Sequence, residues 1–512
     1  MSCYLVGTDI GTTGTKTVLI DTDGNILAHS FQDYPLITNY MGYAEQEPEL
    51  YWEAACKTIS EVILNSKINP KKIQGIAISG LSPACIMINR QLEPLQLAHI
   101  WMDRRSTLQC QWLIDNIGQE RIFNISANPI DPYYSLTKLM WERDNRPLLY
   151  KEAFKMLSAA DYPVMKLTGV AVTDYSNASL YGIAFNIRKK TWDEQLIRDI
   201  KIDINKLPEV LPCEEIAGYV TKEASTKTLL PAGTPVLAGT VDCNAAWVGA
   251  GAIQEGDTSI AMGTTGVIGV VHKQEKFSRK MITIVHAANS RETYTTLSAQ
   301  LCGAIYKYFR DNFINDRTNN SGNDEADTFK VMDLEAQNIN PGSDGLILLP
   351  YFQGERTPVW DPLARGLIFG INLNHTRGHL IRAVMEGVGY AFRDNFNIIK
   401  KSGIKMTLPI VMIEGGAKSK LWRQIVCDML EVPGAYLKNS SGAPFGSAIL
   451  AGVGTDVFKD FNIVKKLNEI RDITEPDKNT AGVYKKYFRI FQKLYKNNKS
   501  LFKDLAAVKS EL

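Results

Sequence analysis

The 512-residue sequence lacks several features that define common protein classes. No uncharged apolar run approaches the roughly 20 residues that a helix needs to cross a bilayer, and the first residues lack the cationic segment of a secretory signal. The eight cysteines are scattered, without a Cys-x-x-Cys pair or a histidine at metal-ligand spacing. We therefore expect reduced thiols in a cytoplasmic protein that has no membrane partner.

The sequence also lacks an excess of charge of either sign. Its 57 Lys and Arg residues against 55 Asp and Glu residues give a formal net charge of +2. This charge is too small to indicate binding to nucleic acid or to an anionic membrane surface, so a small-molecule partner is favoured. The length favours two or more domains with a cleft between them, because single cores seldom grow beyond about 250 to 300 residues.

One tetrapeptide, Gly-Thr-Thr-Gly, occurs twice, at Gly11–Gly14 and at Gly263–Gly266. Each copy lies between two short apolar runs, which predicts a strand, a glycine turn and a second strand. The two halves of the chain are therefore expected to share one plan. Strand and helix patterns alternate through the rest of the sequence, which predicts an α/β fold.

The glycine-rich stretch 249–256 precedes the second of these units and is the predicted domain boundary. The first domain then covers residues 1–252 and the second covers residues 253–455. Residues 456–512 are basic and contain an aromatic pattern at helical spacing, which predicts a helical tail packed on the second domain.

Asp9 stands at the end of the first predicted strand, directly before the first glycine turn. Glycines let backbone N–H groups approach an anion, so this turn is a candidate phosphate hairpin. A single Gly-Thr-Thr-Gly copy is explained equally well as a turn that only connects two strands and binds no ligand. Two copies, one from each domain, are what a nucleoside triphosphate between two domains requires. Neither copy has the spacing of a P-loop or of a dinucleotide-binding turn.

Two further segments place polar or glycine residues at strand ends. Asp242 follows the apolar run 236–241 and precedes a helix of small residues, which is where α/β enzymes place catalytic groups, although a capping Asp fits the same pattern. The turn 414–419 lies between a predicted strand and a predicted helix, and its glycines leave room for a base or a ribose.

The sequence resembles the FGGY carbohydrate kinases of the actin-like ATPase superfamily, and among them the xylulokinases are most similar. The resemblance extends through nearly the whole chain to about residue 455. It rests on four stretches, 133–145, 354–358, 366–386 and 415–424.

This resemblance implies two ribonuclease-H-like domains with a cleft between them, and a need for ATP and Mg²⁺. It implies that Asp242 is the general base and that Asp9 holds Mg²⁺ through water. An ordinary Asp, with a pKa near about 3.9, is already deprotonated at pH 7. The remaining nucleotide contacts that it implies are Thr12, Thr13, Gly263 and Thr264 for the triphosphate, and Gly416 and Ala417 for the adenosine.

For the sugar, the resemblance points to Ser82, Pro83, Trp101, Asp103, Arg104 and Asp242. Here the chain departs from the xylulokinases, because Gly80-Leu-Ser-Pro-Ala84 replaces their usual Gly-Gln-Met-His-Gly. The Met-His pair that contacts the ketose is therefore missing. An ion pair of Asp103 and Arg104 at the surface, and a core position for Trp101, are the alternatives to sugar contact.

The predicted activity is ATP-dependent phosphorylation of a terminal hydroxyl of a sugar or polyol. D-xylulose or a related ketose is the first candidate, and L-ribulose, L-fuculose, gluconate and glycerol follow. The rival hypotheses are an actin-like or Hsp70-like nucleotide switch and a catalytically inactive sugar sensor. Many relatives are dimers, but no residue pattern indicates an interface, so a homodimer stays open.

Overall fold

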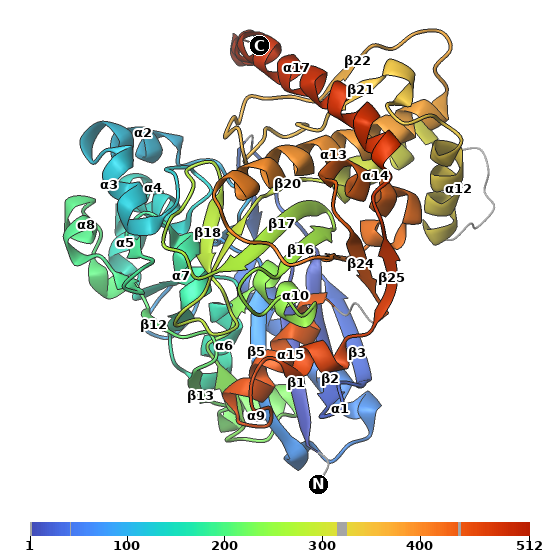
Figure 1. Ribbon diagram of the computed structural model, residues 1–512. Helices are drawn as coiled ribbons and strands as arrows, with labels where there is room; N and C mark the ends of the chain where they lie inside the picture. The colour runs from blue at the N-terminus through green and yellow to red at the C-terminus, as the bar shows by residue number, and fades with distance from the viewer. Residues whose placement is uncertain (1–2, 41, 315–324, 439–441, 512) are drawn as a thin grey trace.

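The computed structural model describes residues 3–40, 42–314, 325–438 and 442–511. Each half of the chain builds one lobe around a mixed β-sheet, and the two lobes lie against each other (Figure 1). The predicted α/β class and both strand–turn–strand units are confirmed. In the described part of the chain, no helix is both long and apolar enough to span a bilayer.

The first sheet contains the first predicted hairpin. Across the sheet the strands are β13 (Ile216–Tyr219), β14 (Pro235–Leu237), β5 (Ile73–Gly80), β1 (Tyr4–Ile10), β2 (Gly14–Asp21) and β3 (Ile26–Asp33), with β15 (Thr240–Val241) beside β5. β1 and β2 are antiparallel, whereas β5 runs parallel to β1. The ends of β1, β5 and β15 therefore meet at one edge of the sheet, next to the turn between β1 and β2.

The second sheet repeats this arrangement. Its strands are β18 (Ile282–Val285), β19 (Tyr294–Leu297), β17 (Thr265–His272), β16 (Thr258–Met262), β23 (Ile410–Ile413), β24 (Gly434–Leu437) and β25 (Ile470–Thr474), with β20 (Gln300–Leu301) beside β17. β16 and β17 form the second hairpin, and β23 runs parallel to β16.

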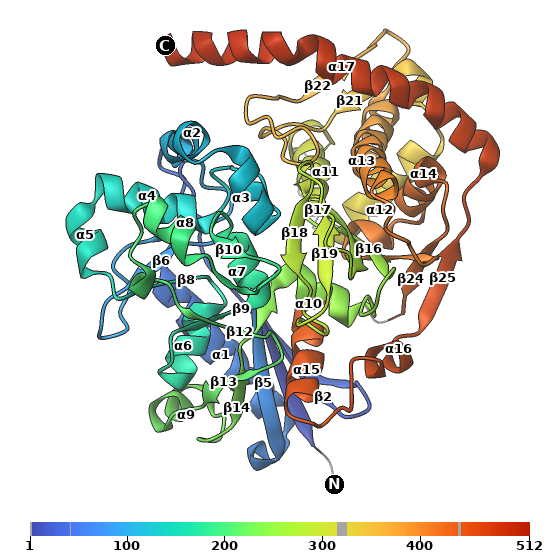
Figure 2. The ribbon, with the colours of Figure 1, turned by 60° about the vertical axis from the view of Figure 1, so that its left-hand side comes forward.

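Helices and small strand pairs complete the first lobe, and Figure 2 shows α2 to α5 and α8 grouped at its outer side. The helices are α1 (Pro48–Ser66), α2 (Thr107–Asn116), α3 (Gln119–Ser126), α4 (Ser135–Asn145), α5 (Pro147–Glu152), α6 (Asp161–Thr168), α7 (Tyr175–Tyr181), α8 (Glu194–Asp199), α9 (Lys222–Thr228) and α10 (Asp242–Gly249), with the short turns η1 (Pro70–Lys72) and η2 (Ile204–Lys206). The pairs are β4 (Glu45–Gln46) with β7 (Ala98–His99), β6 (Ile86–Ile88) with β8 (Lys155–Leu157), β9 (Val172–Asp174) with β12 (Glu209–Leu211), and β10 (Phe185–Asn186) with β11 (Thr191–Trp192).

The second lobe has its core around one long buried helix, α13. The helices in the second half of the chain are α11 (Gly303–Phe309), the π-helix η3 (Arg310–Ile314), α12 (Glu325–Gln337), α13 (Arg377–Lys401), α14 (Lys420–Leu430), α15 (Gly442–Gly454), α16 (Ile463–Leu467) and α17 (Lys478–Glu511), with η4 (Ser343–Gly345), η5 (Gly416–Lys418) and the pair β21 (Ile347–Leu349) and β22 (Leu367–Phe369). The last helix, α17, packs against α14 and β21. The tail also supplies a strand, since β25 pairs with β24.

One helix from the second half of the chain belongs spatially to the first lobe. α15 packs against β1, β5 and α10, as Figures 1 and 2 show. The contact has no space for side chains at two glycines. A Cβ atom on Gly446 would lie 1.7 Å from the carbonyl oxygen of Ala245, and one on Gly7 would lie 1.9 Å from that of Pro444. The backbones of α15, α10 and β1 are therefore in direct contact.

We expect Gly446→Ala to destabilise the protein by roughly 1–3 kcal/mol or more, because the added methyl group forces α10 and α15 apart. Gly482→Ala is the matched control, since Gly482 lies in α17 and a Cβ atom there meets nothing within 4 Å. That control should be neutral or stabilising. Thermal unfolding of both variants checks the prediction, and equal midpoints would contradict it.

Candidate active site

The turn between β1 and β2 presents free backbone N–H groups. Its carbonyl oxygens are held by the first lobe: Tyr34 Oη donates to Gly11 O (2.6 Å) and Gln46 Nε2 donates to Thr12 O (2.9 Å). Across the described ranges, no protein group accepts the N–H of Thr12 or Thr13. The turn is therefore a ready donor site for an anion.

The turn between β16 and β17 has the same property. The carbonyl oxygen of Gly263 accepts the N–H of Gly303 (2.7 Å), and that of Thr264 accepts the N–H groups of Cys302 and Ala304 (both 3.2 Å). Among the residues that the structure describes, nothing accepts the N–H of Gly263 or Thr264. Both predicted phosphate turns thus have occupied carbonyls and open N–H groups.

The third glycine turn lies beside the second one. A Cβ atom on Gly416 would lie 2.8 Å from the carbonyl oxygen of Met262, the residue before Gly263. Ala417 is fully buried, and its carbonyl oxygen accepts Arg423 Nη1 (2.6 Å). Gly415 faces open space, since a Cβ atom there would meet nothing within 4 Å. Two of the three predicted nucleotide-contacting turns therefore adjoin each other in the second lobe.

Three carboxylates meet where the lobes face each other. Asp9 ends β1 and its Oδ1 accepts the hydroxyl of Ser79 on β5 (2.8 Å). Asp242 is the first residue of α10, and its Oδ1 accepts the N–H of Cys243 (2.6 Å). Glu414 follows β23 in the second lobe, and the charges of Asp9 and Glu414 both raise the pKa of Asp242. Residues from three distant segments thus form one acidic cluster.

Desolvation governs the ionisation of this cluster. Burial, and then the charge of Asp9, raise the pKa of Asp242 to about 8. Burial likewise raises the pKa of Asp9 to about 6 and that of Glu414 to about 6, while Lys16 on β2 lowers both. This environment favours the protonated form of Asp242 more than the expectation of an ordinary Asp allows. Its environment makes Asp242 a much stronger base than a free carboxylate.

Glu414 and Lys16 were not among the predicted site residues. Glu414 has a left-handed backbone (φ 73°), which is uncommon for a residue with a long side chain. Its Oε2 would lie 1.7 Å from a Cβ atom on Gly263, so its carboxylate packs against the second phosphate turn. The sequence signal was its place between a predicted strand and Gly415-Gly416. Its nearness to Asp9 depends on how the lobes pack, which no local pattern reveals.

The donor set suits a hard divalent cation such as Mg²⁺, because the cluster offers carboxylate oxygens and a surplus of negative charge. Among the described residues, no three His, Cys, Asp or Glu side chains are arranged to hold a metal by themselves. A cation at Asp9 would therefore need oxygen ligands from water or from phosphate groups. That is the usual situation of Mg²⁺ in nucleotide sites.

The segment Ser82–Pro83 lies beside the aromatic ring of Tyr133, whose hydroxyl donates to Ser82 O (3.3 Å). Ser82 Oγ is buried and finds no hydrogen-bond partner among the described residues. Trp101 is half-buried and its Nε1 donates to Thr12 Oγ1 (3.0 Å). Ser82, Pro83 and Trp101 thus adjoin Tyr133 or the first phosphate turn.

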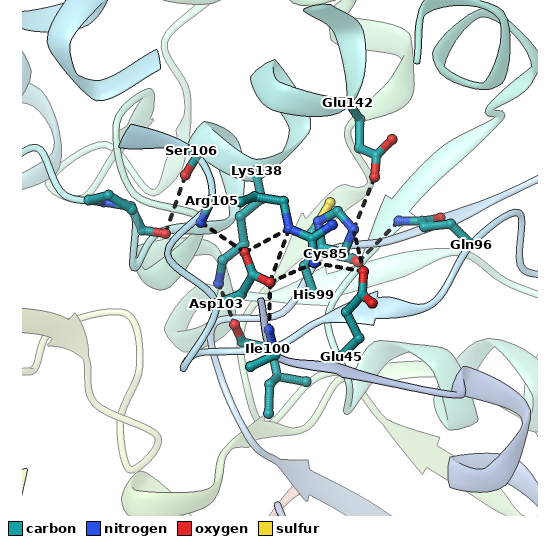
Figure 3. A network of polar contacts seen from close by, with 12 residues as sticks. Glu45, Cys85, Gln96, His99, Ile100, Asp103, Arg105, Ser106, Lys138 and Glu142 are labelled. Carbon is teal, nitrogen blue, oxygen red and sulfur yellow. Dashed lines mark hydrogen bonds and ion pairs between the residues drawn. The ribbon is translucent and has the colours of Figure 1, made fainter. Parts of the chain in front are cut away.

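Asp103 lies elsewhere, in the buried network that Figure 3 shows. Its Oδ1 accepts Arg105 Nε (2.9 Å), and its Oδ2 accepts Arg105 Nη2 (2.7 Å) and the N–H of Ala44 (2.8 Å). Arg104 pairs instead with Asp131, with Nη2 and Oδ2 3.0 Å apart. Both side chains are occupied by protein partners, so their contact with a sugar stays a prediction that this geometry does not favour.

The network has a structural effect on the aromatic residues. Lys138 of α4 is fully buried and its Nζ donates to Ile100 O (2.7 Å) and to Tyr133 O (2.9 Å). These carbonyls belong to Tyr133 and to the residue before Trp101. Close by, His99 Nε2 contacts Glu142 Oε1 (3.0 Å) in the core (Figure 3). The buried polar groups therefore fix the backbone that presents Trp101 and Tyr133.

Comparison with known proteins agrees with this architecture. The N-terminal domain model of the FGGY family of carbohydrate kinases matches residues 4–249, and the C-terminal domain model matches residues 258–455. The chain is 29% identical to a xylulose kinase of Bacillus subtilis over 97% of this chain and 98% of the relative, and 28% identical to a gluconokinase of the same organism over 96% and 95%.

Among solved structures, xylulose kinase from Rhodospirillum rubrum superposes with a TM-score of 0.87 at 26% identity, covering 98% of this chain and 100% of that one. The predicted fold of two ribonuclease-H-like domains is thereby confirmed.

We expect Asp242→Asn to stabilise the ligand-free protein, and to do so more at pH 8.5 than at pH 5. The pKa of Asp242 is raised in the folded state. Below about pH 4 this carboxyl group is therefore protonated in both the folded and the unfolded protein, and it does not lower the free energy of unfolding. As the pH rises from about 4 toward 8, Asp242 ionises in the unfolded protein but stays protonated in the folded protein, so the free energy of unfolding falls.

An asparagine at position 242 does not ionise, so the variant does not lose stability in this way. The difference in thermal midpoint between variant and parent should therefore grow with pH. Asp477→Asn is the control, because the pKa of Asp477 is lowered through its bond to Thr480. A gain at Asp242 that is the same at both pH values would refute the predicted buried, uncharged Asp242.

Proposed function

The chain belongs to the FGGY family of carbohydrate kinases, and we propose that it transfers the γ-phosphoryl group of ATP to a terminal hydroxyl of D-xylulose or a related ketose. Membership of this family establishes the general activity, which is phosphorylation of a sugar or a related molecule. It also argues against the hypothesis of an actin-like or Hsp70-like nucleotide switch. The residue roles rest chiefly on one observation. Asp242 lies in a single acidic cluster with Asp9 and Glu414, next to turns with open N–H groups.

In the proposed reaction, the N–H groups of Thr12, Thr13, Gly263 and Thr264 donate to the phosphate oxygens. Phosphoryl transfer needs charge neutralisation and alignment more than covalent help, so fixed donors are suitable catalysts. Asp9 would hold Mg²⁺ through water, and the ion would supply further neutralisation of the phosphate charge. Gly416 and Ala417 flank the adenosine, where the open side of Gly415 leaves room for a flat group.

Asp242 accepts the proton of the attacking sugar hydroxyl. Its position at the start of α10 is fixed by backbone contacts rather than by a flexible loop. Its raised pKa of about 8 lies close to neutral pH, where general bases are most effective. A cation beside Asp9 would lower this pKa, because an opposite charge favours the ionised carboxylate.

The choice of D-xylulose rests on the xylulose kinases, which match the chain over nearly its full length. Gluconate is the second candidate, because a gluconokinase matches almost as well and the usual xylulokinase Met-His pair is replaced by Ser82-Pro83. L-ribulose, L-fuculose and glycerol are further acceptors to be tested.

An ADP-release assay with these five acceptors tests the proposal, and we expect the highest kcat/KM with D-xylulose. Asp242→Ala should lower kcat by on the order of 10²–10⁴-fold, because general-base catalysis contributes that much. Its affinity for ATP, measured by calorimetry, should change little. Asp199→Ala, at the end of α8 where the carboxylate pairs with Arg121, is the control. Unchanged turnover of Asp242→Ala would refute the base assignment, and no ADP release with any acceptor would refute the activity.

Glu414→Gln should shift the acidic limb of the pH profile of kcat/KM to lower pH. The negative charge of Glu414 raises the pKa of Asp242, so its removal lowers that pKa and leaves the base ionised at more acidic pH. Profiles of the parent and the variant at saturating ATP and Mg²⁺ measure the shift. A shift toward higher pH, or none, would mean that Glu414 does not act on the base.

A further inference from the structure

A loop of the second lobe reaches the aromatic residues of the first lobe. Arg356 follows β21, and its guanidinium carbon lies 4.8 Å from the ring centre of Trp101 and 5.5 Å from that of Tyr133. Both rings belong to the lobe that contains Ser82 and Asp9. Arg356 is therefore a side chain of one lobe that lies over the surface of the other.

The backbone of this loop is anchored in its own lobe. Thr357 Oγ1 accepts the N–H of Ala299 (2.8 Å), and Glu355 and Asp361 exchange two backbone hydrogen bonds (2.8 and 2.9 Å). The carboxyl group of the buried Glu355 accepts the N–H of Arg356 (2.9 Å). The side chain of Arg356 extends from this anchored backbone toward the first lobe, so its position is set by the second lobe.

The two rings are equally well fixed. Trp101 is held through Nε1 by Thr12, Tyr133 is held through its hydroxyl by Ser82 O, and the buried Lys138 binds the carbonyls of Ile100 and Tyr133. The guanidinium group therefore lies on a rigid aromatic surface next to the first phosphate turn.

The N–H groups of Arg356 have no acceptor within the described ranges, where the side chain forms neither a hydrogen bond nor an ion pair. Most of the other arginines that lie over rings have acidic partners. Arg105 lies over Tyr43 and binds Asp103 and Glu45. Arg423 lies over Tyr436 and binds Asp472. A half-buried guanidinium group with five N–H donors and no protein acceptor is suited to an outside ligand.

The neighbouring groups indicate what that ligand is. Ser82 Oγ, adjacent to the Tyr133 hydroxyl, is buried and also lacks a partner in the described structure. The charges of Arg356 and Asp242 both act on the Tyr133 hydroxyl, so the proposed base and the guanidinium group both lie near that hydroxyl. Unpaired polar groups around an aromatic surface are typical of a site for a polyhydroxylated molecule.

We propose that Arg356 is an acceptor-binding residue that the second lobe supplies. Its guanidinium group donates to an oxygen of the sugar other than the one that Asp242 deprotonates, while the sugar lies against Trp101 and Tyr133. This inference rests on the proposed function. It makes the acceptor a bridge between the lobes, so that sugar binding favours their approach.

Arg356→Ala should raise KM and the calorimetric Kd for the acceptor by roughly 10- to 100-fold, which is the effect of losing hydrogen bonds from a charged donor. KM for ATP should change less than about threefold. Arg356→Lys should not restore the acceptor affinity, because an ammonium group cannot reproduce the planar fork or its contact with two rings.

Arg365→Ala is the matched control, since Arg365 lies further along the same loop and binds the carbonyls of Pro362 and Ala364. It should leave both KM values and the thermal midpoint close to those of the parent. D-xylulose and gluconate are both measured. A larger loss for gluconate places the guanidinium group at the carboxylate end, and an equal loss places it at a hydroxyl that both acceptors share.

Unchanged acceptor affinity in Arg356→Ala, with the parent enzyme active, would overturn the inference. So would an equal rise of both KM values together with a lower thermal midpoint, because that result indicates a merely structural role. Arg356→Gln, which retains a polar side chain, keeps the test valid if the Ala variant folds poorly. If the parent enzyme releases no ADP with any sugar, the proposed function fails instead.

Discussion

Desolvation of three carboxylates is the constraint on which the proposed site between the lobes depends. Asp9, Asp242 and Glu414 come from β1, α10 and the end of β23, and burial raises the pKa of each. Lys16 is the cation that opposes this effect at Asp9 and Glu414. Such a cluster is unfavourable when it is empty and becomes favourable when a cation binds beside it. The protein therefore needs a frame that keeps the carboxylates together.

That frame is α10, which is held from two sides. On one side α15 contacts its backbone at Gly446 and Ala245. On the other side Asn244 Nδ2 donates to Val285 O of β18 (2.9 Å), which belongs to the second sheet. Asp242, at the start of the same helix, cannot move away from Asp9 without breaking these contacts. Because α15 comes from residues 442–454, this frame joins segments that are far apart in the sequence.

Local patterns in the sequence predicted the parts of the site that depend on local structure. Both phosphate turns and the place of Asp242 follow from an apolar run and the polar or glycine residue that ends it. The partner of a charged side chain is set by tertiary packing, which such patterns do not contain. Asp103 pairs with Arg105 and Arg104 with Asp131, whereas the sequence suggested a pair of Asp103 and Arg104. The raised pKa of Asp242 and the position of Arg356 over Trp101 depend in the same way on the packing of the lobes.

The duplicated plan places one carboxylate beside each phosphate turn, but the two carboxylates differ in origin. Asp9 precedes its turn in the same hairpin, whereas Glu414 comes from a neighbouring strand and packs against Gly263. The left-handed backbone of Glu414 costs roughly 1–2 kcal/mol, and a glycine would avoid this cost. Packing does not require the glutamate side chain either, because its carboxylate faces the turn and the other acidic groups. Its charge has an electrostatic effect, because it raises the pKa of Asp242. The backbone strain at Glu414 therefore places an acidic side chain, and not a glycine, beside the second Gly-Thr-Thr-Gly turn.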